Sequence, residues 1–126
     1  MAIHTHAQKT ELKSFGKPDE VRTFPAGKLE LVNIGGATVG RAVFEPGWRW
    51  SESVKPIAKT DSCKAPHFQY HVSGVLRCRM DDGTEFDCRP GDVTSVPEGH
   101  DAWVVGNEPV VVVDFQGMLD YAKGTK

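Results

Sequence analysis

The sequence predicts an all-β domain, built as an antiparallel sandwich or a closed barrel. Short runs rich in Val, Ile, Phe and Thr alternate with Gly, Pro and Asp turns along most of the chain. No convincing helical pattern precedes a short one over residues 118–123. The 126 residues suffice for one core but not for two. We therefore expect a polar tail over residues 1–17 and one β-domain over residues 18–126.

The first half of this domain predicts a hairpin followed by a long loop. Residues 29–34 and 38–44 form strand-like runs on either side of Gly35-Gly36, a pair that tolerates the positive φ angles of a tight turn. A Glu-Pro-Gly segment then breaks the pattern, because proline lacks the N–H that a ladder needs and glycine accepts turn geometry. Residues 51–66 consequently read as a loop.

Further strands are predicted in the second half, again from apolar runs bounded by turn residues. Ser73-Gly74 marks a bend or bulge between the first two of them. Together with the earlier hairpin, these runs give about eight strands. They cover residues 68–72, 75–80, 84–89, 93–96, 102–105 and 110–115.

The three cysteines are an odd number, which suits a reducing compartment and a cytoplasmic protein; they are Cys63, Cys78 and Cys88. A two-residue Asp-Gly turn at 82–83 would place Arg77, not Cys78, opposite Cys88. Because neighbouring side chains of a strand point to opposite faces, this register puts Cys78 and Cys88 on opposite faces of the sheet. We expect both to act as small buried or half-buried hydrophobic side chains.

Charge and composition argue against several classes of function. The net charge of −2 and the scattered Lys and Arg residues give no basic patch for nucleic acid. No stretch approaches the roughly twenty apolar residues that cross a bilayer, so no membrane partner is expected. No phosphate-cradling glycine loop or dinucleotide fingerprint is present, which argues against a nucleotide cofactor. His4 and His6 lie in the tail, where the cost of ordering the chain weakens a metal site.

Two segments carry a resemblance to a known family. Residues 91–99 contain a glycine, five residues and then Pro-x-Gly, which resembles the second sequence motif of the cupins. Residues 67–74 are similar to the end of the first cupin motif, in which a metal-binding glutamate sits seven residues before a glycine. The resemblance implies a cupin-type jelly-roll barrel, or double-stranded β-helix. Three further segments look like those of bacterial stand-alone cupin-domain proteins that have no assigned reaction; they are residues 46–51, 61–63 and 99–106.

The chain departs from the usual cupin metal ligands. His67 takes the place of the glutamate in the first motif, and the His-x-His pair that normally precedes it is absent from residues 60–63. In the second motif Ala102 stands where cupins usually have a histidine, while His100 directly follows Pro-x-Gly. The usual site of three histidines and one glutamate therefore does not carry over to this sequence.

Three polar side chains, His67, Gln69 and His71, share one strand face, and the resemblance places that face in the lumen. Inside a barrel they need hydrogen bonds or a ligand. We expect His67 and His100 to bind one divalent Zn, Fe, Ni or Cu ion, with Cys63 or Gln69 completing the shell. His71 lies about 13 Å along the strand from His67, so we expect it either to support the metal ligands or to contact the bound ligand.

Three functions are compatible with these residues. The first is a metal-dependent enzyme that acts on a small polar substrate by Lewis-acid polarisation or oxygen activation. The second is a metal-independent ligand-binding or sensor module, in which the lumen histidines only form hydrogen bonds. The third is a structural dimer module, in which the edge of the 29–44 hairpin pairs with a partner strand; the resemblance also implies a homodimer. Three tryptophans either line a ligand cavity or fill the core, namely Trp48, Trp50 and Trp103.

Overall fold

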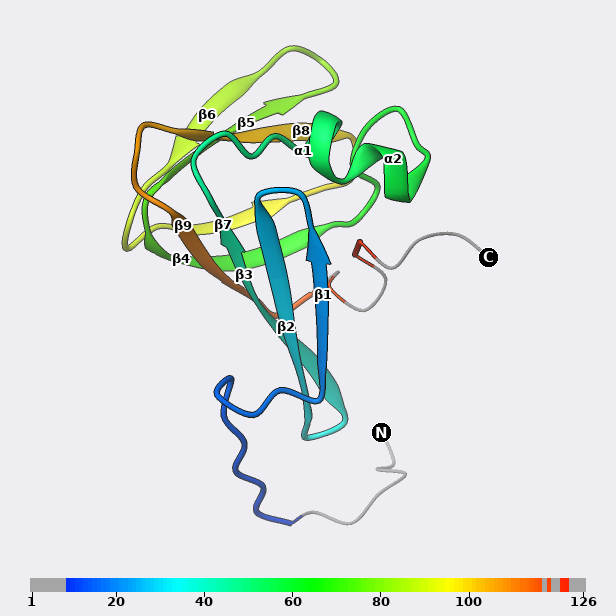
Figure 1. The fold of residues 1–126 in the computed structure, drawn as a ribbon, viewed down its shortest axis with the longest axis vertical. Coiled ribbons are helices and arrows are strands. Elements are labelled where there is room, and N and C mark those ends of the chain that lie inside the picture. Colours follow the sequence, from blue (N-terminus) through cyan, green and yellow to red (C-terminus); the bar gives the residue numbers. More distant parts are fainter. Residues whose placement is uncertain (1–8, 117, 119–120, 123–126) are drawn as a thin grey trace, which may run out of the picture.

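The computed structural model describes residues 9–116, 118, 121 and 122, and this part of the chain contains nine strands and two one-turn helices (Figure 1). The all-β prediction is confirmed. The strands are β1 (Glu20–Phe24), β2 (Gly27–Ile34), β3 (Ala37–Phe44), β4 (His67–Ser73), β5 (Val75–Met80), β6 (Glu85–Cys88), β7 (Val93–Val96), β8 (His100–Val105) and β9 (Val110–Asp114). The helices are α1 (Trp50–Ser53) and α2 (Lys55–Ala58).

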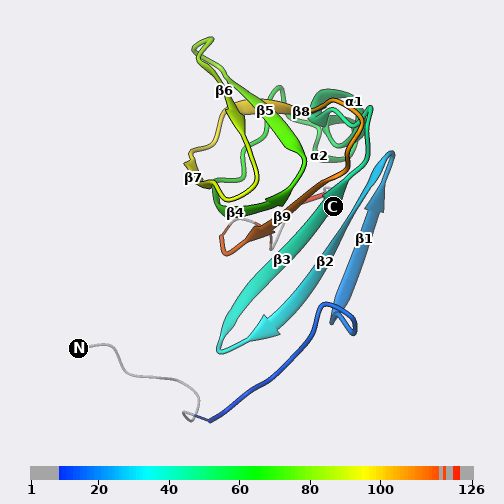
Figure 2. The same ribbon diagram turned by 90° about the vertical axis from the view of Figure 1, so that its left-hand side faces the viewer.

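The strands form two antiparallel sheets around a common interior. The larger sheet has the order β1-β2-β3-β9-β4-β7, and the smaller has the order β6-β5-β8. Strands β4 to β9 make a curved body, from which β1, β2 and the far part of β3 extend as a ribbon (Figures 1 and 2). Residues from both sheets meet in the hydrophobic core, so the interior of the curved body is the lumen that the sequence predicts.

The β2–β3 hairpin turns at Gly35-Gly36, as predicted, with positive φ angles of 60° and 78°. The prediction that this hairpin offers a free edge is wrong. Strand β1 pairs with β2 on one side, and β9 pairs with β3 on the other. Most of the hairpin is therefore interior to the larger sheet.

Strand β1 is missing from the prediction because charged residues interrupt its apolar pattern. Its Arg22 is nevertheless buried, with 8% of the residue exposed. The guanidinium Nη1 donates to the carbonyl oxygens of Met118 and Tyr121, at 3.2 and 2.7 Å. Arg22 thus satisfies two backbone carbonyls of the C-terminal segment and fixes that segment against the sheet.

The β5–β6 turn differs from the predicted two-residue turn. A three-residue loop, 81–83, joins the strands, because the N–H of Met80 donates to the carbonyl of Thr84 at 2.8 Å. The last residue of the loop has a φ of 94°, as expected where a type I turn is followed by one left-handed residue. This adds one residue to the turn and shifts the register by one. The predicted opposite faces for Cys78 and Cys88 are therefore wrong: both are buried in the interior.

The predicted loop over residues 51–66 contains helices α1 and α2, which lie beside β8 at one end of the body (Figure 1). Each is a single turn, too short to produce a helical periodicity in the sequence. Trp50 and Val54 point into the core from this segment. Lys59 ends α2 in the left-handed conformation, with a φ of 60°.

Part of the predicted tail contacts the domain. The backbone N–H of Gly35 donates to Glu11, and Lys13 pairs with Asp19 at 3.0 Å. His4 and His6 lie outside the described residues, as do three positions of the helix predicted over 118–123. The described positions of that helix, 118, 121 and 122, are not helical; 121 and 122 form a turn. Among the helices of the described part, none has the length and apolar character needed to cross a membrane.

Candidate metal centre

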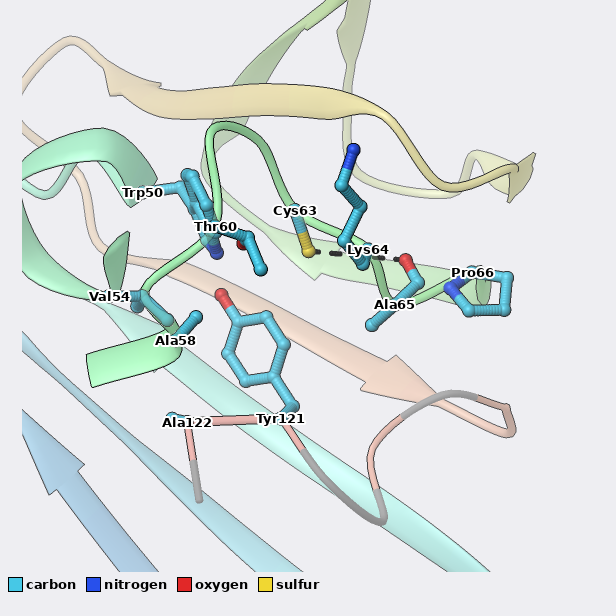
Figure 3. Close-up of a pocket in the computed structure, with 10 residues that line it drawn as sticks. All are labelled: Trp50, Val54, Ala58, Thr60, Cys63, Lys64, Ala65, Pro66, Tyr121 and Ala122. Atoms are coloured by element: carbon cyan, nitrogen blue, oxygen red, sulfur yellow. Dashed lines mark hydrogen bonds between the residues drawn. The ribbon is translucent and has the colours of Figure 1, made fainter. Parts of the chain in front are cut away.

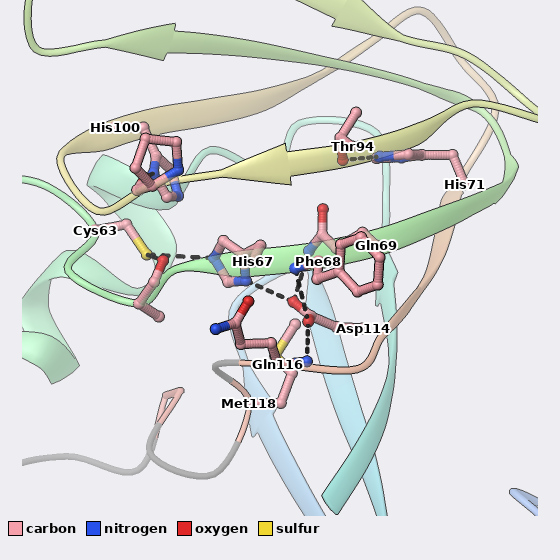
Figure 4. Close-up of polar contacts among 12 residues, drawn as sticks. Cys63, His67, Phe68, Gln69, His71, Thr94, His100, Asp114, Gln116 and Met118 are labelled. Atoms are coloured by element: carbon pink, nitrogen blue, oxygen red, sulfur yellow. Dashed lines mark hydrogen bonds and ion pairs between the residues drawn. The ribbon is translucent and has the colours of Figure 1, made fainter.

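Three side chains converge at one end of the lumen: Cys63 from the loop after α2, His67 at the start of β4 and His100 at the start of β8 (Figure 4). All three are buried, and their ligand atoms lie within 4.8 Å of one another. Backbone hydrogen bonds bring the loop and β8 together. The N–H of Cys63 donates to the carbonyl of His100 at 2.8 Å, and the N–H of Gly99 donates to the carbonyl of Cys63 at 2.7 Å.

The His67 ring is oriented by Asp114, a fully buried carboxylate at the end of β9. Nδ1 of His67 donates to Oδ2 of Asp114 at 2.5 Å, and the amide of Gln69 donates to the same oxygen at 2.9 Å. The backbone N–H groups of Phe68 and Gln116 donate to Oδ1, at 3.3 and 2.8 Å. The carboxylate thus accepts four hydrogen bonds, and in its contact with His67 the proton lies on Nδ1 of the ring.

His100 is oriented in an equivalent way. Its Nδ1 donates to the carbonyl oxygen of Pro97 at 2.8 Å, and because a carbonyl only accepts, this nitrogen carries a proton. In the neutral tautomers the free lone pairs of both rings are therefore on Nε2. Metal-binding histidines are typically arranged in this way, with the second nitrogen held by a carboxylate or a carbonyl.

The spacing of Cys63 and His67 fits a tetrahedral metal. Nε2 of His67 lies 3.6 Å from Sγ of Cys63. Zinc bonds of about 2.3 Å to sulfur and 2.0–2.1 Å to nitrogen put these ligands about 3.6 Å apart in a tetrahedral site. His100 belongs to the same group, whose ligand atoms all lie within 4.8 Å of one another. Three protein ligands would leave one position of a tetrahedral ion for another ligand.

Electrostatics favour a thiolate at Cys63. Burial by itself would raise the pKa of this thiol, but hydrogen bonding to His100 and His67 and the charges of both rings lower the pKa to about 6. Burial by itself would lower the pKa of His67, but Asp114 and Cys63 raise it to about 9. Without a metal, Cys63 and His67 therefore form a thiolate–imidazolium pair near neutral pH.

Two cavities meet at this group. The lumen cavity, between Cys63, His67, Gln69, Cys78, Val96 and His100, has a volume of about 20 Å³. The outer pocket has a volume of about 360 Å³ (Figure 3). Its lining includes Trp50, Val54, Ala58, Cys63, Lys64 and Tyr121. Trp50, Cys63 and Tyr121 line both cavities, so the thiol lies at the boundary between them.

The other polar residues predicted for the site lie around it. Gln69 is buried but its amide binds Asp114, so it supports the ring of His67. Nε2 of His71 contacts the hydroxyl of Thr94 at 2.9 Å, and Nδ1 has no hydrogen-bond partner among the described residues. His71 lines neither of the two cavities. Strand β4 directs Gln69 and His71 inward, as predicted, while a register shift after His71 confirms the bulge.

The three tryptophans have different environments. Trp50 lines both cavities, as a ligand-contacting residue would. Trp48 stacks on Phe44, with ring centroids 3.9 Å apart, and lines only the lumen cavity. Trp103 lies against the guanidinium of Arg49, whose carbon is 4.1 Å from the ring centroid, and lines neither cavity.

Sequence reasoning missed two residues of the site, Asp114 and Tyr121. Asp114 ends the run Val110–Asp114, which reads as a buried strand, and a charged residue directly after such a run was the available signal. Tyr121 lies in the segment for which the sequence predicts a short helix, and its ring centroid is 5.7 Å from that of His67. Nothing in the sequence pattern indicates its contribution.

The fold has many solved counterparts. A structure of unknown function from Rhizobium leguminosarum bv. viciae superposes with a TM-score of 0.61 at 17% identity, covering 86% of this chain and 99% of its own. A cupin-like protein from Thermotoga maritima superposes with a TM-score of 0.53 at 16% identity, covering 90% and 83%. The chain has the cupin fold. A sugar phosphate isomerase from a cupin superfamily of Silicibacter pomeroyi gives a TM-score of 0.53 at 19% identity, covering 78% and 73%.

The sequence itself matches no protein-family model and no curated protein. Likeness at such low identity shows the cupin fold and not the reaction, because cupins of different function share one barrel. The assignment of function therefore depends on the side chains of this chain, beginning with Cys63, His67 and His100.

Proposed function

We propose that this cupin binds one divalent transition metal through Sγ of Cys63, Nε2 of His67 and Nε2 of His100, and acts as a metal-dependent enzyme on a small molecule. The observation that carries this proposal is the orientation of the two imidazoles. Asp114 and Pro97 each accept a hydrogen bond from an Nδ1–H, so in the neutral rings both Nε2 atoms are free to bind a metal, and the ligand atoms of both rings and of the thiol lie within 4.8 Å of one another. One thiolate with two imidazoles favours zinc or copper over the hard oxygen-seeking ions.

Each part of the site has a separate role. A bound metal with an open position supplies Lewis acidity to a carbonyl, hydroxyl or water at that position. Asp114 and Gln69 fix the rotamer and tautomer of His67, so the ligand set needs little reorganisation. The lumen cavity of about 20 Å³ has room for one water molecule or one ion, and the larger reactant is left to the outer pocket.

Titration of chelator-treated protein with cobalt(II) tests the metal centre. We expect one equivalent to bind, with a thiolate-to-cobalt charge-transfer band and the intense visible absorption of a four-coordinate ion. Cys63→Ser should remove the charge-transfer band, and His100→Ala should weaken binding. Cys88→Ser is the matched control, because Cys88 is also a buried thiol but lies outside the group. Absence of metal from purified protein, together with no cobalt binding, would contradict the proposal.

A second candidate function is nucleophilic catalysis by Cys63 without a metal. Sγ of Cys63 lies 3.6 Å from Nε2 of His67, and Nδ1 of the same ring lies 2.5 Å from Oδ2 of Asp114. A thiol, a base and a carboxylate that orients the base are therefore in contact, as nucleophilic catalysis requires. Iodoacetamide distinguishes the two functions. Rapid alkylation of Cys63 that is unchanged by equimolar zinc supports the nucleophile, whereas protection by zinc supports the metal centre.

A further inference from the structure

The reactant that the proposed centre acts on must occupy the outer pocket. The lumen cavity is too small for an organic molecule, whereas the outer pocket has about 360 Å³ and reaches Cys63. The pocket lies outside the barrel, between the α1–α2 segment, the loop that carries Cys63, and Tyr121 (Figure 3). Its own lining can therefore indicate the class of ligand.

The lining is mainly apolar and aromatic. Trp50 and Val54 come from the α1 region, and Ala58 comes from the end of α2. Tyr121 forms the facing wall, and Ala65 continues the apolar surface beyond Cys63 (Figure 3). A sugar or polyol would leave most of its hydroxyl groups without partners here, at a desolvation cost for each. The walls fit a flat apolar body instead.

The pocket lining includes one cationic side chain, that of Lys64. Lys64 is exposed, and its Nζ donates to the hydroxyl of Ser62 at 3.3 Å. That hydroxyl donates in turn to Oδ2 of Asp81 at 2.9 Å, but no carboxylate of the described residues lies within ion-pair distance of the ammonium group itself. Lys64 is the sole charged side chain of the pocket lining apart from a Cys63 thiolate. A single ammonium group at an apolar pocket matches a ligand with one acidic group.

We infer that the outer pocket binds a small, largely apolar organic acid, with its ring or chain between Trp50 and Tyr121 and its carboxylate at Lys64. The inference rests on the proposed function in taking this ligand as the reactant of the metal centre. It replaces the small polar substrate that the sequence alone favours. Placed in this way, the apolar body lies against Cys63, one of the three proposed metal ligands.

Three probes of similar size test the inference by NMR titration of the backbone and indole N–H signals. They are 3-phenylpropanoate, its neutral analogue 3-phenylpropan-1-ol, and gluconate, which keeps the charge on a polar body. We expect 3-phenylpropanoate to shift the Trp50 indole signal and to bind roughly two- to fivefold more tightly than the alcohol. Gluconate should not bind. Binding of gluconate as tightly as 3-phenylpropanoate, or no response to either aromatic probe, would overturn the inference.

Two variants separate the charge from the apolar wall. Lys64→Met keeps the aliphatic stem and should remove the preference for the acid over the alcohol, and Lys55→Met, outside the lining, should not. Ala58→Phe fills the pocket and should abolish binding of both aromatic probes. An unchanged acid preference in Lys64→Met contradicts the assigned role of Lys64.

The same titrations distinguish failure of this inference from failure of the metal centre. The probes are added first to chelator-treated protein and then to protein loaded with cobalt(II). If cobalt binds and the aromatic acid does not, the pocket assignment alone is wrong. If the acid binds and cobalt does not, the metal centre alone is wrong, because Ala58 and Lys64 contribute no metal ligand.

Discussion

The carboxylate of Asp114 decides which nitrogen of His67 faces Cys63. Asp114→Asn keeps the size of the side chain but removes the charge that holds the proton on Nδ1 of His67. We predict a 10- to 100-fold loss of metal affinity, the range typical for loss of such a supporting carboxylate. Competition between the protein and a chromophoric chelator for zinc measures this loss.

Asp101→Asn is the control for this substitution. Asp101 lies next to His100 in the chain, but its carboxylate contacts Arg49 and the N–H groups of Ser51 and Ala102. The control should therefore keep the zinc affinity of the wild type. Equal losses in the two variants would mean that a general structural change, and not the orientation of His67, lowers the affinity.

The shifted pKa values of Cys63 and His67 predict how stability depends on pH in the metal-free protein. The pKa of Cys63 falls from 9.0 to about 6 on folding, so its contribution to stability rises from pH 6 and is complete above pH 9. The pKa of His67 rises from 6.5 to about 9, so its contribution is complete below pH 6.5 and is lost as the pH approaches 9. In the wild type the contribution of Cys63 therefore rises with pH while that of His67 falls.

Cys63→Ser removes the contribution of the thiol and narrows that of His67, whose pKa is then raised by Asp114 without Cys63. The free energy of unfolding of this variant should fall, relative to that of the wild type, as the pH rises from 6.5 to the reduced pKa of His67. The limiting slope of the difference is about 1.4 kcal/mol per pH unit. Urea unfolding across this range measures it, and parallel profiles for the two proteins would contradict the thiolate–imidazolium pair.

At the level of single residues, the sequence could predict the histidines but not their partners. His67 and His100 stand at positions fixed by the motif resemblance, and Cys63 precedes His67 by four residues. Asp114 lies 47 positions from His67, and the pairing of β4 with β9 that joins them has no local signature. Contacts of this kind depend on strand order, which alternating hydrophobicity does not specify.

Among the elements, a turn is easier to predict when its residue types indicate it than when the number of residues in the loop decides its geometry. Gly35-Gly36 was recognised because both residues need positive φ angles. The loop over 81–83 has the same Asp-Gly ending as a two-residue turn, but one more residue belongs to it. That single residue places Cys78 on the same face of the sheet as Cys88. An error of one position in the turn thus assigned the side chains of a strand to the wrong face.

The crossing from β4 to β5 predicts a specific sensitivity at Gly74. This residue has a φ of 74°, and a Cβ atom there would lie 2.5 Å from the carbonyl oxygen of Pro109 and 2.8 Å from Cα of Val110. Gly74→Ala therefore adds a backbone clash to the conformational strain. Gly83→Ala, at a φ of 94° with nothing within 4 Å, adds strain alone.

We expect Gly83→Ala to lower the free energy of unfolding by about 1–2 kcal/mol, the cost of a left-handed conformation for alanine. Gly74→Ala should cost about 1–3 kcal/mol more, as overpacking typically does. Urea midpoints of the two variants measure the difference. Equal midpoints would show that the β4–β5 crossing can move away from β9 at little cost.

For the whole molecule, turn spacing predicted an all-β domain, and the cupin resemblance supplied the choice of a barrel. The order of the larger sheet was not predictable, because β3 pairs with β9 and β9 with β4 over long separations in sequence. The same non-local pairing brings the residues of the site together. Its ligands come from a loop, from β4 in the larger sheet and from β8 in the smaller one.

A metal bound by these ligands should therefore stabilise the entire barrel against unfolding. It joins Cys63, His67 and His100 only in the folded chain, so zinc at 100 times its dissociation constant should add about 2.7 kcal/mol by mass action. For a domain of this size each kcal/mol raises Tm by roughly 3–5 °C, which differential scanning calorimetry resolves. The increase should persist in Cys88→Ser and disappear in His100→Ala. An equal rise of Tm in His100→Ala would mean that zinc binds elsewhere on the protein, since His100 supplies one of the three donors.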